Sequence, residues 1–270
     1  MTIYATHGVV TNAVRERFSH RNLLDIDKFA DHLRRRPQPY LPLAIALEQG
    51  GDSLTIDDAT EAAGNAAGLA RQLGHDVTLF VNGYNISNRQ PYFFSRLNVA
   101  LDETKLEKLS YQNEEFDLQS YGGKCRFRSA VKARLTRMGS ETDRQNIVTE
   151  ICYRLDVRDI VIPSYLHPLT ETGVRDLLSI GVDIQNHGWS HSPIGSMTAE
   201  AHADDIRRGR QWLKVSFGVD AHHYAVPNGD GLPYWTTSPH YRTWLLLDED
   251  FGRDRSFSPG VFPRSTLNLP

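Results

Sequence analysis

The sequence is poor in cysteine. Its 270 residues include only Cys125 and Cys152, which lie far apart and form no Cys-x-x-Cys pair. A zinc site built from thiolates needs closely spaced cysteines, so the sequence argues against one. We expect two free thiols, as is usual in a reducing compartment, with one disulfide between them as the alternative.

A large excess of one charge and long apolar runs are also missing. The formal net charge at pH 7 is −3, so no broad basic field attracts nucleic acid or an anionic membrane. No run approaches the roughly 18 apolar residues of a membrane-spanning helix. Residues 1–7 lack the basic and apolar regions of a secretory signal. We therefore expect a cytoplasmic protein with no transmembrane segment and no nucleic-acid partner.

What is present is the composition of an ordinary globular protein, 40% hydrophobic and 23% charged. Strand-type residues at 53–56 lead into a helical pattern over 62–73, and Gly74 stands where helices commonly end. Residues 76–81 form a second strand pattern. A strand-helix-strand unit of this kind is typical of a parallel sheet or barrel, so we predict an α/β fold.

Further elements follow from hydrophobic spacing. We predict strands over 2–10, 182–184, 222–226, 243–247 and 260–262. We predict helices over 24–36, 169–180 and 198–217. In the first strand, the lone His7 is expected to be packed or hydrogen-bonded rather than to bind a ligand.

The block 88–160 is less regular than its surroundings. It contains two predicted helices, 126–138 and 141–156, and we interpret it as a mainly helical insertion within a single domain spanning 1–270. Its aromatic run 91–94 is expected to pack in the core, with a platform for a sugar ring as the alternative.

Three polar motifs each follow a predicted strand. They are Asp57-Asp58, His187-x-x-x-His191 and Pro227-Asn228-Gly229. In α/β barrels and sheets the active site is built where strands reach their carboxyl ends. We therefore expect the three motifs to share one site.

The residue types in these motifs suit metal chemistry. One carboxylate and two imidazoles bind a divalent transition ion and leave positions open for water and substrate. Because successive side chains of an extended chain diverge, one of the two aspartates can bind the ion while the other acts as a base. A metal lowers the pKa of its water to about 7, so a modest base is sufficient.

The same motifs resemble those of the polysaccharide deacetylases of carbohydrate esterase family 4, also called the NodB-homology family. Thr55-Ile-Asp-Asp-Ala59 resembles T-F-D-D-G, Asn186-His-Gly-Trp-Ser-His191 resembles N-H-T-W-S-H, and Tyr224-Ala-Val-Pro-Asn-Gly229 resembles F-R-P-P-Y-G. The resemblance covers 1–10, 24–82 and 169–230, whereas the middle block carries little of it. The chain is thus identified as a divergent member.

This resemblance implies a distorted (β/α) barrel and a metal-dependent hydrolase that removes the acetyl group from an acetamido sugar. Asp58, His187 and His191 would hold Zn²⁺, with Co²⁺ or Ni²⁺ as alternatives, and Asp57 would be the general base. A backbone N–H near Asn228, in the turn that Pro227 begins, would bind the oxyanion. The resemblance gives no indication of the oligomeric state.

The sequence departs from the family pattern at three positions. Ala59 replaces a glycine, Ala225 replaces the arginine that orients the base, and the late Leu-x-His motif of the general acid has no counterpart. Arg264, in a Pro-Arg pair near the end of the chain, is a candidate replacement for the arginine. The candidates for the proton donor are His240, His222, His223 and the water on the metal.

These departures leave three other interpretations open. The first is a catalytically impaired protein that binds metal and carbohydrate, and the second is a deformylase acting on an N-formyl amino sugar. The third is a non-haem iron oxygenase, which the strand-helix-strand pattern disfavours. If the protein is cytoplasmic, a deacetylase would act on a nucleotide- or lipid-linked precursor of a surface polysaccharide such as O-antigen.

Overall fold

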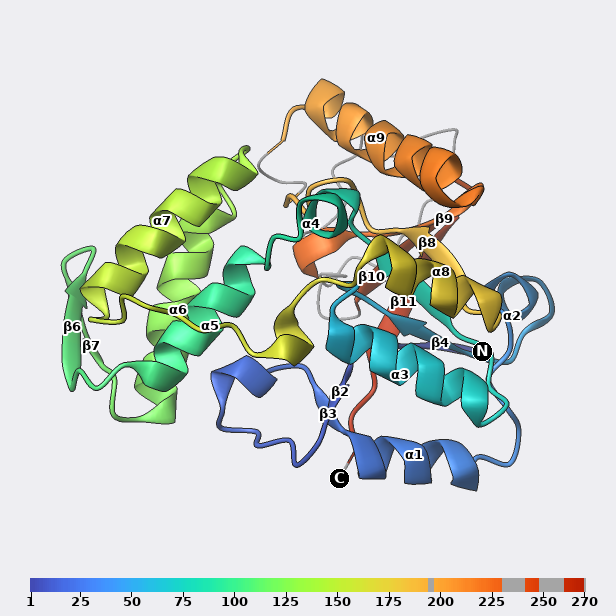
Figure 1. Ribbon diagram of the computed structural model, residues 1–270, viewed down its shortest axis with the longest axis horizontal. Helices are drawn as coiled ribbons and strands as arrows, with labels where there is room; N and C mark the ends of the chain where they lie inside the picture. Colours follow the sequence, from blue (N-terminus) through green and yellow to red (C-terminus); the bar gives the residue numbers. More distant parts are fainter. Residues whose placement is uncertain (194–196, 230–240, 248–259, 270) are drawn as a thin grey trace.

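The computed structural model describes residues 1–193, 197–229, 241–247 and 260–269. Within these ranges, parallel strands close into a seven-stranded barrel at the centre of the molecule (Figure 1). Their order is β1-β11-β10-β9-β8-β5-β4, and β4 pairs with β1 to complete the ring. The strands are β1 Thr2–Thr6, β4 Asp52–Ile56, β5 Thr78–Val81, β8 Asp183–Asn186, β9 His223–Ala225, β10 Thr243–Leu247 and β11 Val261–Thr266. The predicted α/β barrel is confirmed.

The pairing around the ring is uneven, which makes the barrel irregular. Strands β1 and β4 pair along their whole length, from Thr2 opposite Asp52 to Thr6 opposite Ile56. Strands β8 and β9 pair only at Asn186 opposite Tyr224. The interior is filled by apolar side chains, and one cluster of them comprises Ile3, Leu43, Phe80, Ala225 and Leu245. The barrel is therefore a packed core and not a pore.

Helices cover the outside of the barrel (Figure 1). They are α1 Ile26–Arg35, α2 Leu43–Gln49, α3 Glu61–Gln72, α4 Gly83–Asn88, α8 Glu171–Ser179 and α9 Ala199–Phe217. Helix α3 begins directly after the two aspartates, where the Thr60 hydroxyl caps it by accepting a hydrogen bond from the Ala63 N–H. Its buried alanines let it lie close against the barrel. This cap fixes where β4 ends and thus where the aspartates lie.

The middle block forms a lobe at the side of the barrel (Figure 1). It contains α5 Phe93–Glu103, α6 Tyr121–Leu135, α7 Glu141–Arg154 and the antiparallel hairpin β6 Lys108–Tyr111 and β7 Glu114–Asp117. The lobe has its own apolar cluster, which includes Leu101, Phe116, Phe127 and Ile151. The expectation of a mainly helical insertion agrees with this lobe, although α5 and the hairpin were not predicted.

The N-terminal segment shows why the predicted strand 2–10 was wrong. Strand β1 ends at Thr6, and after His7 and Gly8 the short strand β2 Val9–Val10 pairs with β3 Leu24–Asp25. Gly8 has φ +133°, and a Cβ there would lie 2.5 Å from the backbone carbon of Ala62. The chain can bend here only because Gly8 has no side chain. His7 therefore lies at the end of a strand, not inside one.

Smaller differences concern the ends of elements. The last strand continues past 262 to Thr266, and α6 begins at Tyr121 because Ser120 caps it. Short 3-10 helices are η1 Phe18–His20, η2 Ser164–Leu166 and η4 Pro227–Gly229. Cys125 and Cys152 are free thiols, as expected. Within the described ranges, no helix combines the length and apolarity needed to cross a membrane.

Candidate active site

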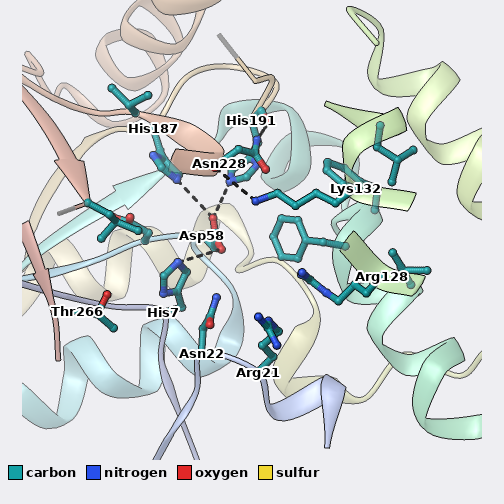
Figure 2. A pocket seen from close by; sticks show the side chains of 17 residues that line it. His7, Arg21, Asn22, Asp58, Arg128, Lys132, His187, His191, Asn228 and Thr266 are labelled. Carbon is teal, nitrogen blue, oxygen red and sulfur yellow. Dashed lines mark hydrogen bonds and ion pairs between the residues drawn. The ribbon is translucent and has the colours of Figure 1, made fainter. Parts of the chain in front are cut away.

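The three polar motifs meet at the carboxyl end of the barrel, where they open into one cavity of about 260 Å³ (Figure 2). Asp57 and Asp58 follow β4, His187 follows β8, and Asn228 follows β9. The opposite wall comes from the helical lobe, which contributes Phe93, Phe94, Leu97, Arg128, Lys132 and Leu135. The cavity therefore lies between the barrel and the insertion.

Asp58, His187 and His191 form a compact group in which one ligand atom from each residue lies within 4.8 Å of the others. The Nε2 atoms of His191 and His187 lie 2.9 Å and 3.4 Å from Oδ1 of Asp58. All three side chains are buried. Elsewhere in the described ranges, no comparable group of metal-binding residues occurs.

The chain adopts unusual backbone angles to bring these atoms together. Asp58 has φ +66° and His191 has φ +52°, both in the left-handed region that residues other than glycine seldom adopt. Gly188, between the two histidines, has φ +82°, and a Cβ there would lie 2.7 Å from Oδ2 of Asp205. Strained residues of this kind cluster at functional sites, where the surroundings hold them in place.

The electrostatics of the group fit a divalent cation. Oδ1 of Asp58 is buried without a hydrogen-bond partner, although two imidazoles face it. Burial raises the pKa of the Asp58 carboxyl, but the neighbouring histidines, His191 first among them, lower it by more. The pKa therefore lies well below its ordinary value, and the carboxyl is ionised. Nδ1 of His187 lies 2.9 Å from the Ala225 carbonyl, which orients its Nε2 toward Asp58. A buried anion facing two imidazole nitrogens is a suitable ligand set for a metal ion.

Asp57 faces a different partner. Both of its carboxylate oxygens accept hydrogen bonds from Arg264, at 2.7 Å and 2.8 Å, and Arg264 lies within β11 and is 1% exposed. Burial raises the pKa of Asp57, whereas the charges of Arg264 and His187 together bring it below its ordinary value. Arg264 thus contacts Asp57 from the last strand, while Ala225 in β9 has no side chain that could.

The turn after β9 contributes Asn228 but not Pro227. The Asn228 side chain lies at the cavity and donates a hydrogen bond of 3.0 Å to the His191 carbonyl. Asn228 has φ +64°, and its carbonyl lies 3.5 Å from Nζ of Lys132. Pro227 does not line the cavity and, as a proline, has no N–H to donate. Its part is limited to shaping the turn.

Two of the histidines proposed as proton donors from the sequence are not at the site. His222 and His223 lie at the opposite end of β9, where their backbone N–H groups bind Oε1 of Gln185. Neither lines the cavity. His240 lies outside the described residues.

His7 is a site residue that was not predicted from the sequence. His7 lines the cavity, and its Nε2 lies 4.0 Å from Oδ2 of Asp58, on the side away from His187 and His191 (Figure 2). The position of His7 directly after β1 was the available signal, because the other site residues also follow strands. The strand predicted over 2–10 placed His7 inside a strand, so its position at a strand end was not recognised.

Two further groups of residues line the cavity. Phe93 and Phe94, from the aromatic run, line it, and the Phe94 ring centre lies 5.3 Å from that of His191. The cations Arg21, Arg128 and Lys132 stand opposite the metal-binding residues (Figure 2). The sequence offered the aromatic run as an alternative platform for a sugar ring, whereas no motif pointed to the three cations.

Comparisons with known proteins agree with this fold. Solved structures similar to the chain include the deacetylase PplD of Streptococcus pyogenes in complex with acetate, with 11% identity, a TM-score of 0.59, and coverage of 100% of this chain and 92% of that one. IcaB from Ammonifex degensii has 12% identity and a TM-score of 0.53, covering 99% of this chain and 91% of that one. A de-N-acetylase from Aggregatibacter actinomycetemcomitans has 11% identity and a TM-score of 0.53, covering 98% and 93%.

At such low identity, these structures establish the fold alone. Among curated proteins, no sequence matches the chain significantly. The family profile named Polysaccharide deacetylase matches residues 52–238, which is most of the chain and includes the aspartates, the two metal-site histidines and Asn228. The chain therefore belongs to the polysaccharide deacetylase family.

Proposed function

We propose that the protein is a metal-dependent hydrolase that removes the acetyl group from the nitrogen of an acetamido sugar. The observation that carries the proposal is the arrangement of the two aspartates: Asp58 faces His187 and His191, while Asp57 is held by Arg264. One carboxylate is thus assigned to the metal, and the other is left for proton transfer. Zn²⁺ is the preferred ion for this ligand set, with Co²⁺ and Ni²⁺ as alternatives.

Asp58, His187 and His191 would hold the divalent ion, which would supply Lewis acidity for activating water and polarising the amide carbonyl. Asp57 takes the proton of the attacking water. Arg264 keeps the Asp57 carboxylate ionised and fixed in orientation through its two hydrogen bonds. A backbone N–H in the turn at Asn228 stabilises the oxyanion of the intermediate.

His7 is our candidate for donating a proton to the leaving amine. An amine is a poor leaving group unless it is protonated, so the site needs a donor. Among the described residues, His7 is the one histidine that lines the cavity besides His187 and His191. The impaired interpretation arose because the arginine that orients the base and the general acid both lacked counterparts in the sequence. Arg264 at Asp57 and His7 at the cavity are candidate replacements for them.

We further propose that the sugar is nucleotide- or lipid-linked, as in a precursor of a surface polysaccharide such as O-antigen. Such precursors are made at the cytoplasmic side of the membrane, and we propose that the enzyme works there. The cationic wall formed by Arg21, Arg128 and Lys132 supports a phosphate-bearing substrate of this kind.

The test is to incubate the zinc-loaded protein with UDP-linked and lipid-linked acetamido sugars and with long acetamido polymers. Mass spectrometry should detect the free amine on the linked sugars, together with an equal amount of acetate. Formate released from N-formyl analogues in preference to acetate would identify a deformylase. Binding without release of either acid would support the impaired interpretation, and reaction only with long polymers would contradict the proposed substrate.

The matched variants are Asp57→Asn and Asp31→Asn. Asp57→Asn removes the proposed base, and we expect it to lower kcat by about 100-fold to 10,000-fold. Asp31 lies on the exposed surface of α1, where it pairs with Arg34, so its variant should keep full activity. If Asp57→Asn turned over acetamido sugars at the wild-type rate, Asp57 would not be the base.

A further inference from the structure

The wall of the cavity opposite Asp58 is formed by cations. Arg128 and Lys132 are one turn apart on α6, so they share one face of that helix. Arg21 follows η1 and approaches from below, and the labelled ends of all three side chains point toward the cavity (Figure 2). The insertion and the N-terminal segment thus place positive charge where the barrel opens.

Arg128 is the best-defined member of this wall. Its Nε donates a hydrogen bond of 2.7 Å to Oδ1 of Asn98 on α5. In the described part of the chain, no carboxylate forms an ion pair with Arg128 or with Arg21 within 4.0 Å. Burial, and next the positive charge of Arg21, lower the pKa of Arg128 to about 10. Among the described residues, the two guanidinium groups near each other therefore have no carboxylate as a counter-charge.

The acids of the cavity do not supply this counter-charge. Asp57 is bound on both oxygens by Arg264, and Asp58 faces the two metal-site histidines. With a divalent ion at Asp58, the cavity would carry an excess of positive charge. Arg128 is half-buried, its hydrogen-bond partner Asn98 is a neutral amide, and Arg21 lies beside it. Keeping Arg128 charged there costs free energy unless an anion binds.

Apolar side chains also line the cavity. They are Phe93, Phe94, Leu97 and Leu135, and the Phe94 ring centre lies 5.3 Å from that of His191. Apolar and aromatic side chains contact the C–H faces of sugar rings, so these residues suit a sugar whose acetamido group lies at the metal-binding residues.

We propose that Arg128 and Arg21 bind an anionic group, phosphate or carboxylate, on the same substrate whose acetamido group lies at Asp58. The proposal rests on the proposed deacetylase function and specifies its substrate class: an acetamido sugar with an acidic substituent near the reacting group. Arginine suits this role because its planar fork pairs with two oxygens of a phosphate or carboxylate. Because Arg128 and its partner Asn98 lie on the insertion, the insertion sets the specificity.

The first experiment compares three acetamido substrates on the zinc-loaded enzyme. They are N-acetylglucosamine 1-phosphate, its neutral methyl glycoside, and a disaccharide of N-acetylglucosamine and glucuronate. We expect kcat/KM to be higher for at least one anionic substrate than for the neutral glycoside. A preference for the first substrate identifies phosphate as the group bound, and a preference for the disaccharide identifies carboxylate.

The variant Arg128→Gln removes the charge and keeps most of the side-chain length. We expect it to raise KM for the preferred anionic substrate by about tenfold or more, because a charged hydrogen bond is lost. The KM for the neutral glycoside should not change. Arg126→Gln is the matched control, because Arg126 is exposed on the same helix and does not line the cavity. Equal KM changes for neutral and anionic substrates would contradict the proposal.

A binding measurement separates this proposal from the deacetylase function. Glucose 1-phosphate has no acetyl group, and its binding to the zinc-loaded protein can be followed by calorimetry. Binding that Arg128→Gln weakens and Arg126→Gln preserves would support the anion site even if no acetamido sugar reacted. Deacetylation with no preference for anionic substrates, and with phosphate binding unaffected by Arg128→Gln, would overturn the anion site and leave the deacetylase function intact.

Discussion

Asp57 and Asp58 are adjacent in the chain and face different partners. Asp58 has φ +66°, which turns its carboxylate toward the histidines, while Asp57 faces Arg264. A pair of neighbouring aspartates would repel each other if both faced the same point. The left-handed backbone at Asp58 therefore separates the two proposed roles, metal ligand and base, within two residues.

Substitutions of Arg264 test whether Asp57 is the general base. In an Arg264→Ala variant, Asp57 loses the charge that lowers its pKa, and burial then raises that pKa. We expect turnover to fall by about 100-fold near neutral pH and the acidic limb of the kcat/KM profile to move to higher pH, with the metal retained. Arg264→Lys, which keeps the charge but not the paired hydrogen bonds, should be intermediate. Unchanged turnover in Arg264→Ala would remove Arg264 from the mechanism.

A substitution of His7 tests whether this residue donates the proton to the leaving amine. A His7→Gln variant should lose about 100-fold or more in amide hydrolysis, because an amine must be protonated as it leaves. Hydrolysis of 4-nitrophenyl acetate should be spared, because its leaving group needs no proton. The control is His32→Gln, since His32 lies on α1 and is hydrogen-bonded to Tyr40. An equal loss with amide and ester would show that His7 has another role.

At the scale of elements, the insertion supports the loop that bears His191. Arg144 on α7 is fully buried, pairs with Glu141 at 2.9 Å and donates a hydrogen bond to the Ser192 hydroxyl. Ser192 in turn contacts Ser190, whose hydroxyl donates to Asp205 on α9. Residues 190–192, which follow β8 and include His191, are thus held from both the lobe and α9.

The variant Arg144→Gln should loosen this loop. We expect a loss of about 3 kcal/mol in unfolding free energy, because Glu141 is left buried without its partner. Metal affinity should fall by about tenfold, as is common when a residue supporting a ligand is removed. Urea denaturation and metal titration measure the two effects. Arg134→Gln is the control, because Arg134 is paired with Glu150 at 3.8 Å and is partly exposed, so it should change stability by at most about 1 kcal/mol.

The sequence predicted the elements whose signals are local. The strands before Asp57, His187 and Asn228 carry regular patterns and turn residues, so their ends could be placed. His7 was missed because the break at Gly8 depends on close contact with Ala62, some 50 residues away in the chain. Residues of the insertion, such as Arg128, were missed because their position depends on packing between the lobe and the barrel, which no local pattern reveals.

At the scale of the whole molecule, the unfolding free energy depends on pH through one buried histidine. His202 on α9 is 3% exposed, and its ring lies near those of Tyr224 and Trp244. Burial lowers its pKa to about 4. The folded protein thus holds His202 neutral, whereas the unfolded chain protonates it below about pH 6.5. Stability should therefore fall as the pH decreases from about 6.5 to about 4.

The variant His202→Phe removes this titration and keeps an aromatic ring in place. Between pH 7.5 and pH 5, the wild type should lose about 2 kcal/mol more unfolding free energy than the variant. Urea denaturation at both pH values measures the difference, and other titrating groups cancel in the comparison. An identical pH dependence in the two proteins would show that His202 is already accessible to protons in the folded state.

The central claim is that the barrel holds one divalent metal through Asp58 and the two histidines, and that Asp57 is not a ligand. Elemental analysis of the zinc-loaded, dialysed protein tests it most directly, beside Asp58→Asn and Asp57→Asn. We predict roughly one equivalent of metal in the wild type and in Asp57→Asn, and almost none in Asp58→Asn. A wild type without metal, or an Asp58→Asn variant that retains it, would contradict the account.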